Sequence, residues 1–124
     1  MQNIYDVMEK LEVIEEGDFL IIKTLIDELS LMTRITDIAK QSKNIIKNSE
    51  YKKFIFDLTK IIHIDSSAIG WLIEMHNIIV KQNNNTMGVV INKNIYSVLA
   101  QLNLDKIVPY YYDMEMAKKI INNE

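Results

Sequence analysis

The sequence of 124 residues contains no cysteine, one proline and three glycines. Without cysteine, neither a disulfide framework nor a zinc site built on thiolates can form. No apolar run approaches the roughly 18 to 20 residues that a helix needs to cross a bilayer. The first 18 residues are acidic and lack the basic and apolar segments of a signal peptide. These absences predict a cytoplasmic protein that is not inserted in a membrane.

The formal net charge of the chain is −3. An acidic chain is poorly suited to the phosphate backbone of nucleic acid and to an anionic membrane surface, so we expect neither as a partner. Apolar residues make up 48% of the chain and charged residues 25%, as in a globular domain with one modest core. We expect a single domain over residues 1–124, with residues 1–9 as a loose N-terminal arm or one helical turn.

The motifs of common catalytic sites are absent. The chain has no glycine-rich phosphate loop, no serine flanked by glycines and no paired-histidine motif. Ser66, His63 and Asp57 could compose a hydrolase triad, but no oxyanion-hole sequence accompanies them. We interpret His63 and His76 as structural or surface residues.

Three aspartates, Asp27, Asp57 and Asp65, stand where apolar runs stop. Sites of parallel sheets gather at the carboxyl ends of the strands, so a carboxylate metal cluster is one interpretation of these positions. The other interpretation is that Asp27 and Asp65 cap helices and that Asp57 makes a strand-end hydrogen bond. Little in the sequence supports the cluster, and we predict no metal, no cofactor and no enzymatic activity.

The spacing of apolar residues predicts strands and helices in the order β-β-α-β-α-β-α-β-α. The runs FLIIKTLI and FIFDL are apolar enough for strands covered on both faces, and Pro109 favours an edge position for the last strand. Strands separated by helices indicate an α/β fold with a mixed, mostly parallel sheet of about five strands and about four helices. The expected strands are 11–15, 19–26, 54–58, 87–91 and 106–112, and the expected helices are about 31–45, 66–81, 95–102 and 113–121.

Two helices show clear apolar faces. In the first helix, apolar or small residues recur at intervals of four and three, at Leu31, Ile35, Ile38, Ser42 and Ile45. In the helix from Ser66, two adjacent stripes form a wide face that should be well buried. The stripes are Ala68, Leu72, Met75 and Ile79, and Ile69, Ile73, His76 and Val80.

The segment IIHIDSSAIGWL, residues 61–72, places one aspartate and two serines between two apolar stretches. If Ser66 begins the following helix, its hydroxyl lies at the positive end of the helix dipole. Orphan amides at that end can hold an anion, so the fold would tolerate a phosphate there. The phosphate would also add close to two negative charges beside Asp65. These properties suit a charge switch that a partner reads.

The segment FIFDLTKIIHIDSSAIGWLIEMH resembles the core of a STAS domain of the anti-sigma-factor antagonist type. The family pattern is an apolar strand ending in Asp-Leu-Ser, a gap, then Asp-Ser-Ser-Gly-Leu-Gly and an apolar helix. Its places are filled here by Asp57, Leu58, Thr59, Asp65, Ser66, Ser67, Ile69 and Gly70. An earlier Gly-x-Leu-Asp corresponds to Thr24, Leu25, Ile26 and Asp27. The resemblance covers about residues 10–121.

Two family glycines are replaced, by Thr24 and Ala68. Thr24 indicates a differently shaped loop before Asp27. Alanine suits a helix interior better than glycine does, and we expect the methyl group of Ala68 to stand where a partner's backbone approaches.

The resemblance implies a substrate and binding protein. In this family, the unphosphorylated domain sequesters a serine kinase that doubles as an anti-sigma factor, which frees a sigma factor and so regulates transcription. The kinase, which holds the ATP and magnesium, then phosphorylates the domain, and a serine phosphatase resets it. The phosphoacceptor place falls on Ser66, with Ser67 as the alternative. The partner-binding surface carried over comprises Asp27, Asp65, Ser66, Ser67, Ala68 and Ile69.

Two other functions compete with this one. A response-regulator receiver has a similar length and a strand like FIFDL, but Glu15 and Glu16 are followed by a turn and a strand instead of a helix, and no proline follows Asp57 closely. A non-switching STAS module, acting as a scaffold or as an accessory subunit of a signalling or transporter complex, would use Ser66 only as a helix cap. The replacement by Ala68 keeps that alternative open.

Overall fold

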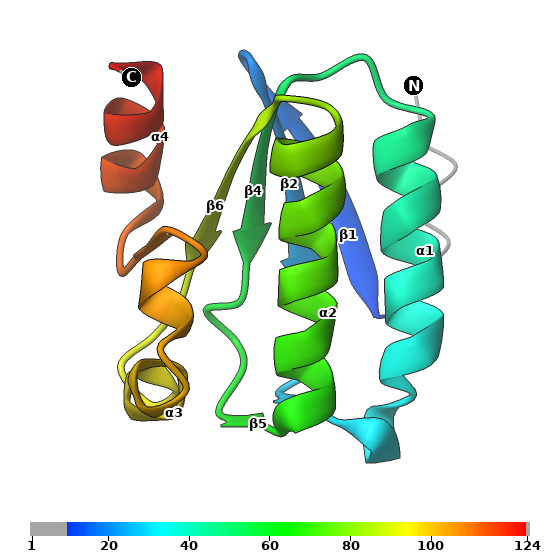
Figure 1. Ribbon diagram of the computed structural model, residues 1–124, viewed down its shortest axis with the longest axis vertical. Helices are drawn as coiled ribbons and strands as arrows, with labels where there is room; N and C mark the ends of the chain where they lie inside the picture. Colours follow the sequence, from blue (N-terminus) through cyan, green and yellow to red (C-terminus); the bar gives the residue numbers. More distant parts are fainter. Residues whose placement is uncertain (1–9, 124) are drawn as a thin grey trace.

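In the computed structural model, which describes residues 10–123, a five-stranded sheet carries helices on both faces (Figure 1). The strand order is β1-β2-β4-β6-β7, and only β1 is antiparallel to its neighbour. The strands are β1 (Leu11–Glu16), β2 (Phe19–Thr24), β4 (Lys53–Asp57), β6 (Thr86–Val90) and β7 (Tyr110–Tyr111). The predicted α/β class and the mixed, mostly parallel sheet are confirmed.

Four α-helices cover the sheet, with α1 and α2 side by side on one face and α4 on the other (Figure 1). They are α1 (Ile35–Lys47), α2 (Ser66–His76), α3 (Tyr96–Gln101) and α4 (Met114–Asn122). A π-helical segment, η3 (Asn77–Gln82), prolongs α2. Among residues 10–123, no helix combines the length and the apolar character that a bilayer crossing requires.

Strand β4 contributes to both apolar cores because alternate side chains leave opposite faces of a strand. Phe54 and Phe56 belong to the larger core under α1, α2 and α3, whereas Ile55 belongs to the smaller core under α4. All three side chains are at most 1% exposed. A strand covered in this way is apolar throughout, which is why FIFDL was recognisable in the sequence.

The larger core contains two consecutive hydrogen bonds that pair its buried polar groups. The indole of Trp71 packs edge-on against Phe56, with 5.5 Å between the ring centroids. Its Nε1–H donates to Ser42 Oγ at 3.3 Å, and that hydroxyl donates to the carbonyl of Ile38 at 2.7 Å. Ser42 therefore occupies the apolar face of α1 without leaving a polar group unpaired.

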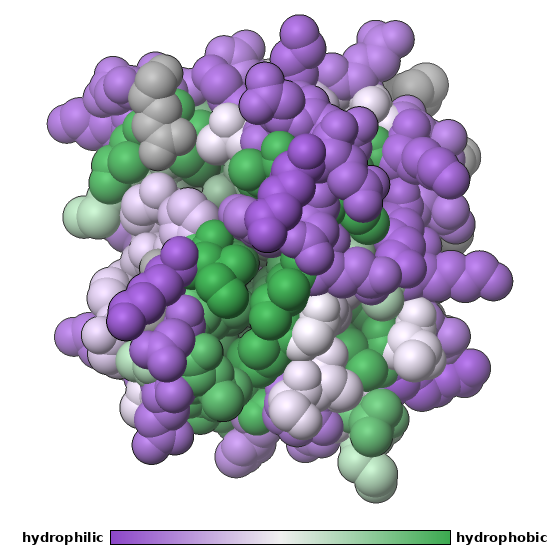
Figure 2. Space-filling view, in the orientation of Figure 1, coloured by the Kyte–Doolittle hydropathy of each residue, from purple (hydrophilic) through white to green (hydrophobic). Residues whose placement is uncertain are grey.

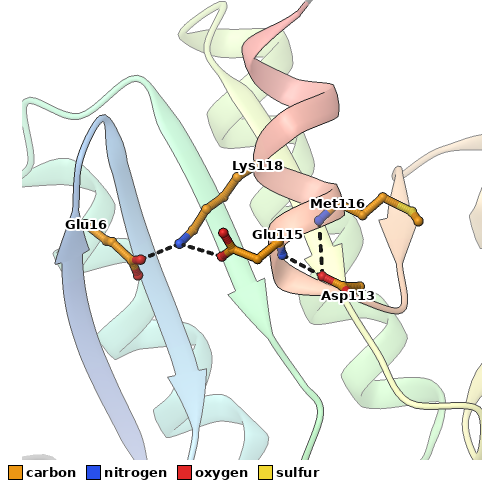
Figure 3. A network of polar contacts seen from close by, with 5 residues as sticks. All are labelled: Glu16, Asp113, Glu115, Met116 and Lys118. Carbon is orange, nitrogen blue, oxygen red and sulfur yellow. Dashed lines mark hydrogen bonds and ion pairs between the residues drawn. The ribbon is translucent and has the colours of Figure 1, made fainter.

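Helix α4 is fastened to the opposite face by an ion pair (Figure 3). Lys118 Nζ lies 2.6 Å from a carboxylate oxygen of Glu16, at the end of β1, and 3.4 Å from one of Glu115. Burial works against the charge of Lys118, but the bonds to the two carboxylates hold its pKa above the usual value. Asp113 caps the helix by accepting the N–H groups of Glu115 and Met116.

Several predicted elements have different bounds in the structure. The helix predicted from about Leu31 starts at Ile35, because Arg34 adopts left-handed backbone with φ +58° and separates it from a short 3-10 helix, η2 (Leu31–Thr33). The strand predicted over 106–112 shrinks to Tyr110–Tyr111, because the chain before it forms another 3-10 helix, η4 (Leu104–Lys106). That strand does lie at the sheet edge, directly after Pro109, as predicted.

A second sheet, which the sequence did not predict, consists of two short parallel strands, β3 (Glu28–Leu29) and β5 (His63–Ile64). The strand predicted over 19–26 accordingly ends at Thr24, where the chain turns toward β3. Two-residue strands show no hydrophobic period, so only the folded chain reveals them. The N-terminal arm predicted over residues 1–9 lies outside the described residues.

The first prediction concerns the buried face of α2. Leu72 is fully buried, so Leu72→Ala should lower the free energy of unfolding by about 2–5 kcal/mol. The matched change Leu102→Ala, at a side chain that is 52% exposed, should alter it by no more than about 0.5 kcal/mol. Denaturant unfolding of both variants gives the comparison, and equal losses would contradict the assigned helix face.

Candidate functional site

The site lies at the end of the molecule where β3, β5 and the first turn of α2 meet, at the bottom of Figure 1. The parallel strands β2 and β4 direct their carboxyl ends toward this region. Loops at the carboxyl ends of strands are where α/β folds carry their binding sites. The chain reaches it through the segment after β4, which Asn92 secures by donating to the carbonyls of Thr59 and Ile61.

The small β3–β5 sheet positions the start of α2. The carbonyl of Asp27 accepts the N–H groups of Ile62 and His63, at 2.8 and 3.3 Å. Two residues further, the carbonyl of Leu29 accepts the N–H of Asp65 at 3.1 Å. These bonds hold Asp65 in an extended conformation, with φ −113° and ψ −179°, from which a helix N-cap acts.

The carboxylate of Asp65 is shared between two segments. Its Oδ1 accepts the N–H groups of Ser67 and Ala68, at 3.0 and 3.2 Å, and the hydroxyl of Ser67. Its Oδ2 accepts the N–H of Leu31, in η2, at 3.2 Å. The hydroxyl of Ser67, followed by these backbone donors, holds the pKa of Asp65 below its usual value. Two of the helix amides that an added phosphate could have used, those of Ser67 and Ala68, are therefore already bonded to Asp65.

The two serines differ in their surroundings. Ser66 is exposed, and its hydroxyl has no hydrogen-bond partner within residues 10–123. Ser67 is half-buried, and its hydroxyl is held by Asp65. The difference follows from the turn of about 100° between successive helix residues, which points one hydroxyl outward and the next back toward the cap.

The remaining predicted residues are distributed between the surface and the core. The side chain of Asp27 is exposed, and its residue lies level with Ile62, three positions before Asp65. Ala68 and Ile69 are 0% and 6% exposed. The expectation that the methyl group of Ala68 stands at the surface is therefore wrong, because the methyl group packs in the core.

The other polar candidates have structural partners. Asp57 Oδ1 accepts the N–H and the hydroxyl of Thr59, at 3.0 and 2.7 Å, which is the strand-end bond anticipated for it. The hydroxyl of Thr24, fully buried, donates to the carbonyl of Asp57 at 3.3 Å. No hydrogen bond joins Asp57, His63 and Ser66 as a triad in the part of the chain described. Nor do residues 10–123 contain a group of three or more acidic residues or histidines placed to hold a metal ion.

His76 lies at the far end of α2 from Ser66. Burial, with a smaller effect of Lys81, lowers its pKa below the ordinary value, so the ring is neutral near pH 7. Its Nδ1 is buried and has no hydrogen-bond partner within residues 10–123. The assignment of His76 as a structural residue is consistent with this position in the core.

Two surface features beside Ser66 were missed in the sequence. The first is the pair Leu31 and Met32, whose side chains are 69% and 87% exposed. We name this pair the η2 tip. The second is a groove of about 600 Å³ between β5 and α3, lined by Ile62, His63, Ile64, Asn94, Ile95 and Val98. Figure 2 shows apolar surface in the lower half of the molecule, over the space between α2 and α3 and around the turn below α1.

Comparison with known proteins identifies the family. The family model of the STAS domain matches residues 10–117, so the chain belongs to the STAS domain family. No curated protein matches the chain in sequence.

Solved structures share its fold at low sequence identity. An anti-sigma factor antagonist from Mycobacterium paratuberculosis is 15% identical with a TM-score of 0.80, covering 90% of this chain and 92% of its own. A STAS domain protein from Planctomyces limnophilus, described as an anti-sigma-factor antagonist, is 19% identical with a TM-score of 0.79, covering 93% and 99%. The antagonist SpoIIAA in its unphosphorylated form is 12% identical with a TM-score of 0.69, covering 89% and 95%.

The second prediction concerns the charge of Asp65. Because folding lowers its pKa, the carboxylate stabilises the fold above its unfolded pKa of about 3.8, and that contribution is lost as the pH falls through the folded value. Asp65→Asn should therefore lower the unfolding midpoint at pH 7, and the gap to the wild type should close below pH 4. Asp18→Asn, at a 78% exposed carboxylate, should open little gap at either pH. A gap for Asp65→Asn that is equal at pH 7 and pH 3 would contradict the assignment.

Proposed function

We propose that this chain is an anti-sigma-factor antagonist, and that phosphorylation of Ser66 switches off its binding to a serine-kinase anti-sigma factor. The observation that carries the proposal is the contrast between the two serines that follow Asp65. The hydroxyl of Ser66 is exposed and without a partner in residues 10–123, whereas that of Ser67 is bonded to Asp65. Membership of the STAS family supports the proposal, because anti-sigma factor antagonists share this fold.

In the proposed phosphoryl transfer, the kinase partner supplies the ATP and the magnesium. The kinase binds ATP and magnesium, and the oxygen of Ser66 attacks the γ-phosphorus while the bond to ADP breaks. The hydroxyl proton passes to a base of the kinase or to solvent. This chain contributes the nucleophilic hydroxyl and a rigid surface around it, so its own role is that of substrate and binding protein, not of enzyme.

The charge of a phosphate on Ser66 would not be neutralised by the helix terminus, because Asp65 already caps it. The N–H groups of Ser67 and Ala68 already donate to Asp65, so they cannot neutralise a phosphate on Ser66 unless that carboxylate leaves. The phosphate therefore adds its charge, close to two units, to the surface beside Asp65. A partner surface suited to a neutral hydroxyl offers no cation to this phosphate, so binding would strip water from the charge without compensation.

The proposed cycle takes place in the cytoplasm. Unphosphorylated antagonist occupies the anti-sigma factor, which frees a sigma factor for transcription, and a serine phosphatase restores the antagonist after phosphorylation. The replacement of a family glycine by Ala68 leaves the surface unobstructed, because that methyl group is buried. The reason to prefer a scaffold or transporter subunit, with Ser66 as a mere cap, is correspondingly weaker.

The third prediction tests the switch. Purified protein is incubated with ATP and each small serine kinase of its own cell, and the phosphate is located by mass spectrometry. We expect one phosphate, on Ser66. Ser66→Ala should retain the affinity of the unphosphorylated protein for the kinase without being released, and Ser66→Asp should weaken that binding at least tenfold, the effect of about 1.4 kcal/mol.

Ser67→Ala serves as the control for this prediction. It removes a hydroxyl that bonds to Asp65, so some stability should be lost while phosphorylation of Ser66 continues. Phosphate on Ser67 alone would reassign the site. An absence of phosphate with every cognate kinase, together with unchanged partner affinity in Ser66→Asp, would reject the switch.

The fourth prediction concerns Asp27. Its carbonyl supports β5, but its side chain is exposed, so Asp27→Asn should change the free energy of unfolding by less than about 0.5 kcal/mol. If the carboxylate belongs to the partner surface, the same change should alter the rate of phosphorylation severalfold. Parallel measurements of unfolding and phosphorylation separate the two roles. A lower free energy of unfolding with an unchanged phosphorylation rate would make Asp27 purely structural.

A further inference from the structure

The η2 tip exposes two apolar side chains, one of which the sequence pattern would bury. Leu31 continues the apolar period of α1, yet 69% of it is exposed, and 87% of Met32 is exposed. Isolated apolar residues are common on protein surfaces and need no explanation. What distinguishes this pair is the backbone that holds it.

The backbone of the tip is fixed by a dense set of hydrogen bonds. Ser30 and Thr33 form a capping box, in which the N–H of Ser30 donates to Thr33 Oγ1 at 2.9 Å and the hydroxyl of Ser30 accepts the N–H of Met32 at 3.1 Å. The same hydroxyl donates to Glu28 Oε2 at 2.6 Å. From outside the turn, Lys10 Nζ donates to the carbonyl of Thr33 at 2.8 Å. The turn is therefore preorganised, because its polar groups are paired before any partner arrives.

The residue that follows this hydrogen-bonded turn has a strained backbone. Arg34, which follows the tip, holds φ +58° and ψ +54°, a left-handed conformation that side chains other than glycine rarely adopt. Such residues persist where the surrounding structure fixes them, and they cluster at functional sites. Arg34 separates the tip from α1, so Leu31 does not join the buried face of that helix.

The tip is also joined to the residue that precedes the candidate phosphoacceptor. The N–H of Leu31 donates to Asp65 Oδ2, and Asp65 is the residue before Ser66. The carboxylate therefore ties the backbone of the tip to the backbone of the helix turn that begins with Ser66. A kinase that brings the γ-phosphate of ATP to Ser66 must place its own surface over the adjoining tip.

We propose that the η2 tip is the apolar anchor of the kinase partner, received in an apolar pocket at the rim of the partner's nucleotide cleft. This inference rests on the proposed function of Ser66 and divides the work between two places. Leu31 and Met32 supply affinity in both states of the protein, since they are uncharged, whereas Ser66 supplies the switch. The unbranched, polarisable side chain of Met32 suits a pocket that must fit and release repeatedly.

The test uses steady-state phosphorylation of the full chain by the cognate kinase. Met32→Ser should raise the KM for this protein about tenfold or more, as loss of an interface anchor does, and should leave kcat close to the wild-type value. The matched control is Met116→Ser, at a methionine of α4 that is 54% exposed and lies on the other face of the sheet. Its KM should stay within about twofold of the wild type, since surface changes away from an interface do little. Thermal unfolding of both variants should match the wild type, because both side chains already face water.

The outcomes distinguish the anchor role of the η2 tip from the switch role of Ser66. Phosphorylation of Ser66 with equal KM values for Met32→Ser, Met116→Ser and the wild type would overturn the anchor and leave the switch standing. A fall in kcat with KM unchanged would also overturn it, because the tip would then act in the chemical step. No phosphorylation of the wild type at Ser66 would remove the proposed function, and the anchor with it.

Discussion

The candidate site depends on one carboxylate, that of Asp65. Oδ1 begins α2 by accepting two helix amides and a hydroxyl, and Oδ2 holds the neighbouring turn through Leu31. A neutral side chain of the same shape could accept fewer of these bonds, which is why an acid stands here. The carboxylate pairs two amides of the helix terminus, whereas the hydroxyl of Ser66 is exposed and has no partner within residues 10–123.

The rest of the fold supports this arrangement at a distance. Trp71 and Leu72 of α2 are buried in the larger core, so the helix that begins at the site is packed over most of its length. Helix α4 packs on the other face of the sheet through Ala117 and Ile121, and Lys118 pairs with Glu16 beside them. Rigid elements place side chains more accurately than loops do, and here the first residue of a packed helix carries the exposed hydroxyl.

Much of this could be predicted from the sequence, for reasons that lie in periodicity. FIFDL could be recognised as a strand because β4 is covered on both faces and is therefore apolar throughout. The apolar stripes of α2 could be recognised because one wide face of that helix is buried. The start of α2 was marked by the Asp-Ser-Ser pattern. The direction of the two hydroxyls followed from helix geometry, although the assignment of Ser66 as the phosphoacceptor remains a prediction.

What could not be predicted depends on long-range pairing. Strands β3 and β5 are two residues each and exist only because residues more than thirty positions apart meet. Leu31 fits the apolar period of α1, but the left-handed Arg34 ends that period and turns the side chain outward. Ala68 was expected at the surface because a family pattern names residues, whereas its burial depends on which side of α2 faces the sheet.

The most direct test of Ser66 as the phosphorylated switch is made on protein purified from its own cells. Fragmentation mass spectrometry of the peptide that contains Ser66 and Ser67 measures the fraction phosphorylated and the position of the phosphate. We expect a single phosphate on Ser66, in a fraction that changes with growth conditions. A peptide that is unmodified under every condition, or modified only on Ser67, would contradict it.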